Sequence, residues 1–251
     1  MSGKIFALFA GVVAVAACCV LRAAEVDPVF YLPFEEQDGA TVCVDRMDAK
    51  RACKLINPKR YSFGAGKAGK ALSLANAKEK LSPAENPNAG VEVLNFWDED
   101  FAKAMSVEVW VRIAEDVEYR RCLMYILQCG GQYGPGFSLY YNWQLFQFIS
   151  GPGKPKELSV VAAPVADLRG QWVHVAVTYD GAKKVARIYI NGECRQEKTD
   201  YVIVPPRSKK QPLAIGRSGL ARGWRGDIDE LKIYKRVLTP VEIFEHAKFG
   251  L

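Results

Sequence analysis

Histidine is scarce in this chain, which has only two among its 251 residues. The cysteines form no Cys-x-x-Cys pair and no His-rich segment accompanies them, so the sequence does not support a zinc site. No serine or cysteine stands near His174 in the pattern of an activated nucleophile. We therefore predict that His174 is a packed or hydrogen-bonded structural residue.

A strong charge excess is also missing. The formal net charge is +6, and the basic residues are spread along the chain, which argues against a nucleic-acid partner. The sequence shows no alternation of strands with helices, no internal repeat and no low-complexity linker. These absences argue against a doubly wound fold and against a chain of several domains.

One long apolar run is present, at the N-terminus. It extends from Ile5 to about Val20, follows a single lysine and precedes small residues, which predicts a secretory signal peptide over residues 1–24. A membrane anchor is the alternative, although the run is at the lower limit of the ~17–25 residues that span a bilayer. We therefore expect an exported protein that is secreted, periplasmic or at the cell surface.

The position of signal cleavage has two interpretations. The segment VAAC, Val15–Cys18, has the apolar-small-small-Cys pattern of a bacterial lipobox. Cleavage before Cys18 would make the chain a lipid-anchored outer-membrane protein, whereas ordinary cleavage after Ala17 or near Ala24 would leave no lipid. The membrane is thus expected as a partner only through the signal peptide or a lipid anchor.

Five cysteines remain beyond the signal peptide: Cys43, Cys53, Cys122, Cys129 and Cys194. Export permits disulfides, and the odd number leaves at least one thiol free or paired between chains. Cys122 and Cys129 lie at the two ends of one predicted strand, about 23 Å apart, too far for a bridge. Cys43 with Cys53 is the more favourable pair, and five isolated thiols are the alternative.

The segment from Gln171 to Glu193 carries the clearest strand signal. Val173, Val175, Val177 and Tyr179 alternate with small or polar residues, which predicts a strand with one buried face. A second strand follows over Val185–Ile190, and Asn191-Gly192 then predicts a tight type I′ turn.

Short segments of the same kind recur along the chain between glycine and proline turns. This pattern predicts an all-β fold, a two-sheet antiparallel β-sandwich of one domain over residues 25–251. Near the end, Thr239, Pro240 and Glu242 form a capping box, which predicts a short C-terminal helix to about Lys248 with Ile243 and Phe244 on its apolar side.

Four blocks of the chain, in order, resemble the laminin-G-like jelly-roll domains of the concanavalin A-like lectin/glucanase superfamily. They are LPFEEQDGATVCVD with GKAGKALSL, then MSVEVWVRI, QWVHVAVTYDGAKKVARIYINGE and GWRGDIDELKIYKRVLTPVEI. The resemblance implies a jelly roll, and it implies that Trp110, Trp172, His174, Asn191 and Gly192 mark the fold rather than a reaction centre. Residues 112–167 match only in their strand pattern.

Asp229 alternates with Leu231 and Ile233, so we expect it to be buried on the core side, where a carboxylate needs a partner. One interpretation is a structural ion pair with Arg217 or Arg225. The other is a calcium ligand, because the resemblance extends to jelly rolls with oxygen-rich Ca²⁺ sites. Calcium is the only cofactor that the sequence suggests.

Glycoside hydrolysis needs two carboxylates in a fixed geometry, and glucanases that share this fold place them along one strand. Here Asp227 and Asp229 share a strand face, but the next position holds Leu231, and the other candidate strand offers only Glu108. The sequence therefore favours a non-catalytic protein.

Aromatic residues concentrate in the segment from Gly130 to Phe148, and exposed rings can stack on sugars. We predict Tyr133, Tyr140 and Trp143 as ligand-binding residues of a lectin-like module for glycans. A cell-surface structural or protein-interaction domain is the alternative, with a surface protein as partner.

Overall fold

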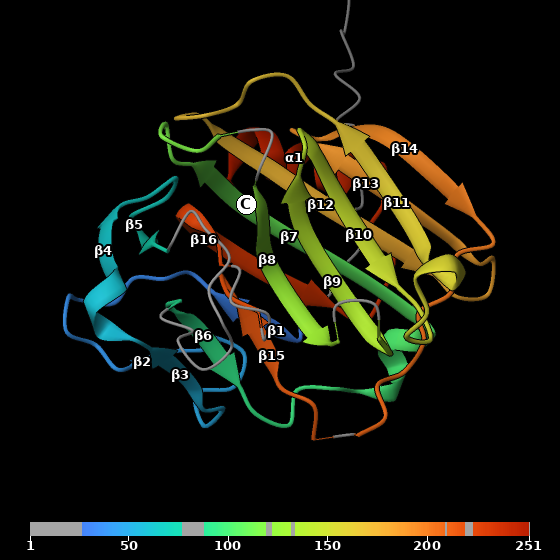
Figure 1. Ribbon diagram of the computed structural model, residues 1–251, viewed down its shortest axis with the longest axis horizontal. Coiled ribbons are helices and arrows are strands. Elements are labelled where there is room, and N and C mark those ends of the chain that lie inside the picture. The colour runs from blue at the N-terminus through green and yellow to red at the C-terminus, as the bar shows by residue number, and fades with distance from the viewer. Residues whose placement is uncertain are drawn as a thin grey trace, which may run out of the picture.

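The computed structural model describes residues 27–76, 88–118, 122–131, 134–208, 210–218 and 223–250. Two eight-stranded antiparallel sheets face each other in these residues (Figure 1), which confirms the predicted sandwich. The predicted signal peptide and Cys18 lie outside the described residues. Within the described ranges, no helix is both long and apolar enough to cross a membrane.

The first sheet carries the face on which the candidate site lies. Its strands, in spatial order, are β14 (Glu193–Thr199), β13 (Val185–Ile190), β12 (Trp172–Asp180), β7 (Ala104–Ile113), β16 (Arg225–Tyr234), β5 (Lys70–Ala75) and β4 (Tyr61–Ala65). The short strand β1 (Phe30–Leu32) pairs with the second half of β16, beyond the part that β5 occupies.

The second sheet covers the other side of the core. Its strands, in spatial order, are β11 (Ser159–Pro164), β10 (Leu145–Ser150), β9 (Gly136–Asn142), β8 (Leu123–Gly130), β15 (Leu213–Ile215), β6 (Gly90–Val93), β3 (Cys53–Ile56) and β2 (Val42–Cys43). Short 3-10 helices lie between strands in the residues that the structure describes: η1 (Pro58–Arg60), η3 (Glu99–Ala102) and η4 (Pro155–Glu157).

The core between the sheets follows from the alternation of residues along the strands. On β12, Val173, Val175 and Val177 point inward and are at most 1% exposed. β7 runs antiparallel beside β12, with Val175 directly opposite Val109. The alternating residues Trp110 and His174 therefore share the outer face of the first sheet, away from the core.

The predicted hairpin and its turn are confirmed. β12 pairs with β13 in the register that places Val177 opposite Ile188. Asn191 and Gly192 connect β13 to β14 with φ of 51° and 85°, the positive values that a type I′ turn requires. The Asn191 side chain also accepts a hydrogen bond from the His174 backbone N–H, which fixes the turn against β12.

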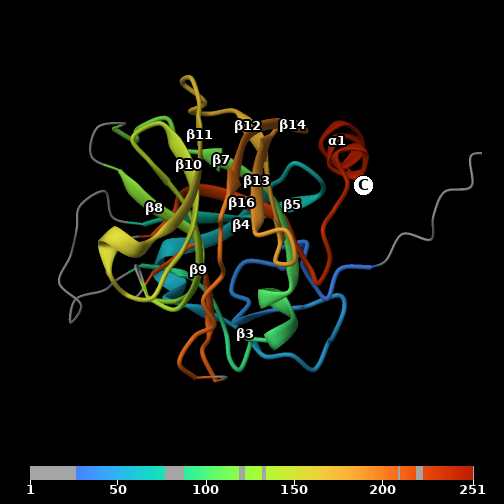
Figure 2. The ribbon, with the colours of Figure 1, turned by 90° about the vertical axis from the view of Figure 1, so that its right-hand side faces the viewer.

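The C-terminal helix α1 (Pro240–Phe249) packs on the outer face of the first sheet, as Figure 2 shows. Thr239 and Glu242 form the predicted capping box, and Gly250 ends the helix with φ of 69°. The predicted apolar side is wrong in part. Ile243 and His246 are buried, whereas Phe244 is 47% exposed, because the helix turns its histidine toward the sheet.

A β-bulge interrupts β16 and decides which way its carboxylates point. Glu230 has φ of 51°, and the register against β7 shifts by one residue between Asp229 and Lys232. Asp229 therefore lies opposite Trp110 on the outer face, while Leu231 lies in the core. The sequence prediction that Asp229 is buried is confirmed, but its assignment to the core side is wrong because simple alternation fails at a bulge.

Candidate ligand-binding site

The outer face of the first sheet has a covered part and an open part. α1 covers the part where Ala176, Tyr189 and Tyr234 form a small apolar cluster with Ile243. The open part lies over β7, β16, β5 and β4. Polar side chains of β7, β12 and β16 link the two parts.

Under α1, a buried glutamate contacts both histidines of the chain. Glu108 Oε2 lies 2.8 Å from His246 Nδ1, and Glu108 Oε1 lies 3.5 Å from His174 Nε2. Burial, opposed by the charge of Glu108 and reinforced by His246, Lys232 and Lys67, lowers the pKa of His174 to about 4. His174 is thus a packed, neutral residue at pH 7, in the structural role that the sequence predicts.

Next to this group, Asp229 holds a loop over the sheet. Its Oδ2 accepts hydrogen bonds from the backbone N–H groups of Lys67 (2.8 Å) and Ala68 (3.0 Å), and its Oδ1 accepts one from Glu230 (2.8 Å). Lys67 in turn lies over the Trp110 ring, 4.3 Å from its centroid.

The partners that the sequence suggested for Asp229 are wrong. Arg225 pairs with Asp116, and Arg217 lies 3.5 Å from Glu92. Backbone N–H groups take the place of an arginine because the loop before β5 passes directly over the carboxylate.

The calcium assignment of Asp229 stays a prediction. In the described ranges, no three His, Cys, Asp or Glu side chains are grouped to hold a metal ion. Burial raises the pKa of Asp229 to about 7, although the three N–H donors act in the opposite direction. A proton can therefore satisfy this carboxylate near neutral pH, in addition to its backbone partners.

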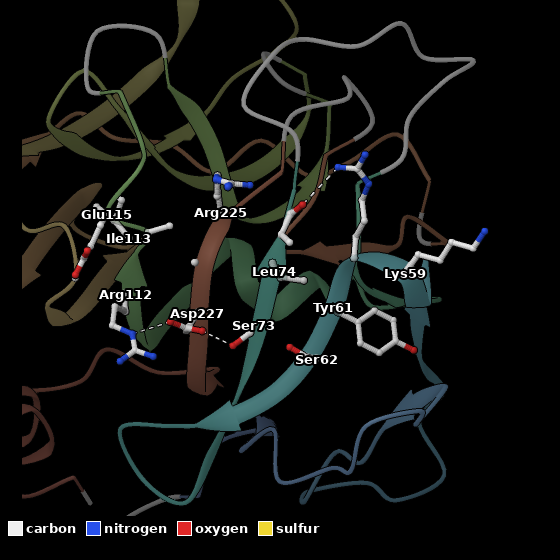
Figure 3. A pocket seen from close by; sticks show the side chains of 15 residues that line it. Lys59, Tyr61, Ser62, Ser73, Leu74, Arg112, Ile113, Glu115, Arg225 and Asp227 are labelled. Atoms are coloured by element: carbon white, nitrogen blue, oxygen red, sulfur yellow. Dashed lines mark hydrogen bonds and ion pairs between the residues drawn. The ribbon is translucent and has the colours of Figure 1, made fainter.

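The open part of the face contains a hollow of about 490 Å³ (Figure 3). Hydroxyl groups come from Ser62 and Ser73. Tyr61, Leu74 and Ile113 also line it, but their side chains pack against the core between the sheets. Its charged residues are Lys59, Arg60, Arg112, Glu115, Arg225 and Asp227. A concave site on which several polar groups converge is a candidate for a small-molecule or sugar ligand.

A row of linked side chains crosses the floor of this hollow. Arg112, Asp227 and Ser73 lie directly opposite one another on β7, β16 and β5. Arg112 Nε donates to Asp227 Oδ2 at 2.7 Å, and the Ser73 hydroxyl donates to Asp227 Oδ1, as the dashed lines of Figure 3 show. Trp172, on the far side of Arg112, stacks under its guanidinium with 4.9 Å to the ring centroid.

Of the three aromatic residues predicted to bind a ligand, the structure describes Tyr140 and Trp143. Tyr140 is 9% exposed, packs on Tyr125 and donates its hydroxyl proton to Gln147 on the outside of the second sheet, so it offers little surface to a ligand. Trp143 is 63% exposed at the β9–β10 turn. Tyr133 lies outside the described residues.

Trp143 occupies an unusual turn. Trp143 and Gln144 have φ of 53° and 60°, values that Asn-Gly satisfies far more easily than a bulky side chain. The turn is tied to the loop before β12 by the Val165 N–H to Gln144 carbonyl bond. That loop leads to Gly170 on the wall of the hollow.

Cys43 and Cys53 lie directly opposite each other on β2 and β3. Both are buried free thiols, and opposite residues of an antiparallel pair have Cα atoms within disulfide range. Burial raises the pKa of Cys53 to about 12 and that of Cys43 further. The folded thiols are therefore poor nucleophiles, and a bridge has to form before the core closes.

We predict that refolding in an oxidising glutathione buffer forms the Cys43–Cys53 bridge. Intact mass should fall by two hydrogens, and peptide mapping should recover the two cysteines in one linked pair. The bridge should raise the free energy of unfolding by about 2–3 kcal/mol, the value for a loop of this length. Cys194→Ser, at an exposed cysteine, should leave the linked peptide unchanged, whereas a linked pair that contains Cys194 instead would contradict the assignment.

Sequence reasoning missed the hollow itself. Arg112 was visible as a polar residue alternating with valines, but nothing in the sequence placed Ser62 and Ser73 beside it. Those two residues come from the hairpin β4–β5, whose position against β16 depends on long-range pairing.

Comparison with protein families gives one match over most of the described chain. The model of the concanavalin A-like lectin/glucanases superfamily matches residues 88–244. Among characterised proteins, pappalysin-1 of Mus musculus is 31% identical over 93 residues, and human pappalysin-1 is 30% identical over a stretch of the same length. These matches span 36% of this chain and only 6% of the length of pappalysin-1.

Solved structures resemble the whole sandwich. Domain 4 of AbnA, a GH43 extracellular arabinanase from Geobacillus stearothermophilus solved with arabinotriose, has a TM-score of 0.63 and 19% identity, covering 88% of this chain and 98% of that domain. The ligand binding domain of botulinum neurotoxin serotype D, solved with N-acetylneuraminic acid, has a TM-score of 0.62 and 15% identity, covering 88% of this chain and 50% of the toxin domain. At these identities the likeness concerns the fold alone.

Proposed function

Since the chain belongs to the concanavalin A-like lectin/glucanase superfamily, we propose that it is an exported, non-catalytic module that binds glycans. The observation that supports the proposal is the hollow on the outer face of the first sheet. Its hydroxyl groups and charged side chains, Ser62 and Arg112 among them, suit the hydroxyl groups of a sugar. Two solved relatives hold sugars, arabinotriose and N-acetylneuraminic acid.

The absence of catalysis is part of the proposal. A glycosidase needs two carboxyl groups that reach the sugar. Three acids on this face are engaged by neighbours: Glu108 by two histidines, Asp227 by Arg112 and Ser73, and Asp229 by backbone N–H groups. Each of these three is at most 9% exposed, which leaves Glu115 as the exposed carboxylate of the hollow, without the second carboxyl group that a glycosidase needs.

Export and anchoring remain proposals that rest on residues 1–24. A module of this kind would meet glycans outside the cytoplasm, whether secreted or held at the outer membrane through a lipid on Cys18. The first 24 residues carry the apolar run and the lipobox on which this depends.

A glycan array followed by calorimetry tests the proposal. The purified module should bind a defined group of oligosaccharides, and Ser62→Trp should weaken that binding at least about tenfold because the indole occupies the hollow. Ser62 is exposed on β4, so the substitution is tolerated on the surface. Thr199→Trp is the matched control, since Thr199 is also exposed on a strand of the same sheet but far along it on β14.

Trp143 is the second binding candidate, and it is tested on the same array. If Trp143→Ala abolishes binding while Ser62→Trp has no effect, the hollow is not the site. If no glycan binds at all, the proposed function fails, and the alternative of a protein-contact domain at the cell surface gains support from the exposed Trp143.

A further inference from the structure

The guanidinium of Arg112 is held in one orientation but keeps an open edge. Trp172 supports its plane and Asp227 accepts from its Nε. Within the described part of the chain, no hydrogen bond or ion pair occupies Arg112 Nη1 or Nη2. The side chain is 36% exposed, so these two nitrogens face solvent at the hollow.

Asp227 and Ser73 hold this guanidinium in place, and hydrogen bonds and strand pairing hold those two residues in turn. Asp227 is 9% exposed, and both of its carboxylate oxygens are occupied, one by Arg112 and one by Ser73. All three residues sit in regular register on adjacent strands. Little side-chain entropy remains to be lost when a ligand binds to Arg112, which is the condition for a preorganised contact.

The hollow is electropositive apart from the ion pair of Arg112 with Asp227. Four cations and two carboxylates line it. Arg225 is neutralised by Asp116 outside the hollow. Lys59 and Arg60, in contrast, have no acidic partner among the residues that the structure describes; Arg60 only reaches the Ala75 carbonyl at 3.4 Å. The rim therefore attracts anions.

We propose that the glycan bound in this hollow carries a carboxylate, which Arg112 binds through Nη1 and Nη2 together. The inference deepens the proposed function and rests on it. A planar guanidinium fork matches the two oxygens of a carboxylate, which a neutral sugar hydroxyl cannot do. Lys59 and Arg60 add long-range attraction at the rim. Both uronic acids and sialic acids present this group.

Matched acidic and neutral ligands test the inference by calorimetry. The probes are oligogalacturonates, the same oligosaccharides with their carboxyl groups reduced to alcohols, and an oligosaccharide that ends in N-acetylneuraminic acid. At least one acidic probe should bind about tenfold or more tightly than the reduced probe. The two acidic probes separate a uronate from a sialic acid as the source of the carboxylate.

Arg112→Lys keeps the charge but removes the fork, so it should weaken acidic binding about tenfold more than it weakens binding of the reduced probe. Arg195→Lys on the exposed strand β14 is the matched control. Should Arg112→Lys fold poorly, as circular dichroism would show, the surface variant Lys59→Ala/Arg60→Ala gives a second measurement. It should weaken acidic binding and flatten its dependence on salt.

Two failures are distinguishable. Equal binding of acidic and reduced probes, or equal losses for both in Arg112→Lys, overturns the carboxylate inference and leaves glycan binding intact. Failure of every oligosaccharide on the array, neutral and acidic, overturns the proposed function as well.

Discussion

Replacing Asp229 with alanine should lower the free energy of unfolding by about 3 kcal/mol, because three backbone N–H groups lose their acceptor at ~1–3 kcal/mol each. Those groups belong to Lys67, Ala68 and Glu230, and the side chain is fully buried. The loss should appear in urea unfolding at pH 7, with faster hydrogen exchange in the loop from Gly66 to Gly69.

Asp100→Ala is the control, because Asp100 is half exposed in a surface pair with Lys103 and its loss should change stability by no more than about 0.5 kcal/mol.

Melting of the same proteins tests whether Asp229 binds calcium. If Asp229 is a calcium ligand, EDTA should lower the melting temperature of the wild type and added Ca²⁺ should restore it. A wild type indifferent to both, with a destabilised Asp229→Ala, supports the structural role.

Acidification should remove about 3 kcal/mol of the stability that neutral His174 contributes, between pH ~6.5 and pH ~4. Burial lowers the folded-state pKa of His174 to about 4, below that of an unfolded histidine. The unfolded chain therefore binds the proton first as the pH falls, and unfolding becomes more favourable. In His174→Gln the imidazole and its pH-dependent contribution are absent. The free energy of unfolding of the variant relative to wild type should therefore rise by about 3 kcal/mol from pH 7 to pH 4.

The difference between variant and wild type is the quantity to measure, since Asp229 acts in the opposite direction. Its pKa is raised to about 7 in the folded state, so its contribution to stability increases as the pH falls through the same window. Lys248→Gln, at an exposed position of α1, serves as the control. Its difference from wild type in the free energy of unfolding should stay constant between pH 7 and pH 4. A His174→Gln difference that stays constant with pH would show that the folded protein accommodates the protonated imidazole.

The sequence was sufficient where structure depends on neighbours along the chain. The alternation through Val173, Val175 and Val177 predicted both the strand and its buried face. Asn191-Gly192 predicted the turn because few other residue pairs adopt positive φ twice. Thr239 and Glu242 predicted the start of α1 through the hydrogen bonds of the capping box.

Prediction failed where a single residue departs from the periodic pattern. Glu230 adopts positive φ without being glycine, and no local signal marks it. That one extra residue moves Asp229 to the outer face and brings the loop of Lys67 and Ala68 over it. Arg217 and Arg225 could not be excluded as partners from the sequence, because their own acids lie far away in the chain.

The candidate site was beyond prediction for a different reason. The high number of aromatic residues in one segment suggested Tyr140 as a ligand-binding residue. Successive side chains of a strand point to opposite faces, and the sequence does not show whether neighbours on the outer face cover a ring. The hollow depends instead on Ser73, Arg112 and Asp227, which come from three strands and lie 39 and 115 positions apart along the chain. Only the sheet order brings them into one row.

The pairing of β1 with β16 has a consequence for how the molecule forms. Phe30 lies opposite Ile233, so β1 can pair with β16 only after the roughly 200 residues between them have been synthesised. Closing so long a loop is entropically costly, and topologies dominated by distant contacts fold in milliseconds to seconds rather than microseconds. Until β16 is made, β1 lacks its partner in the sheet and a chaperone can still bind it.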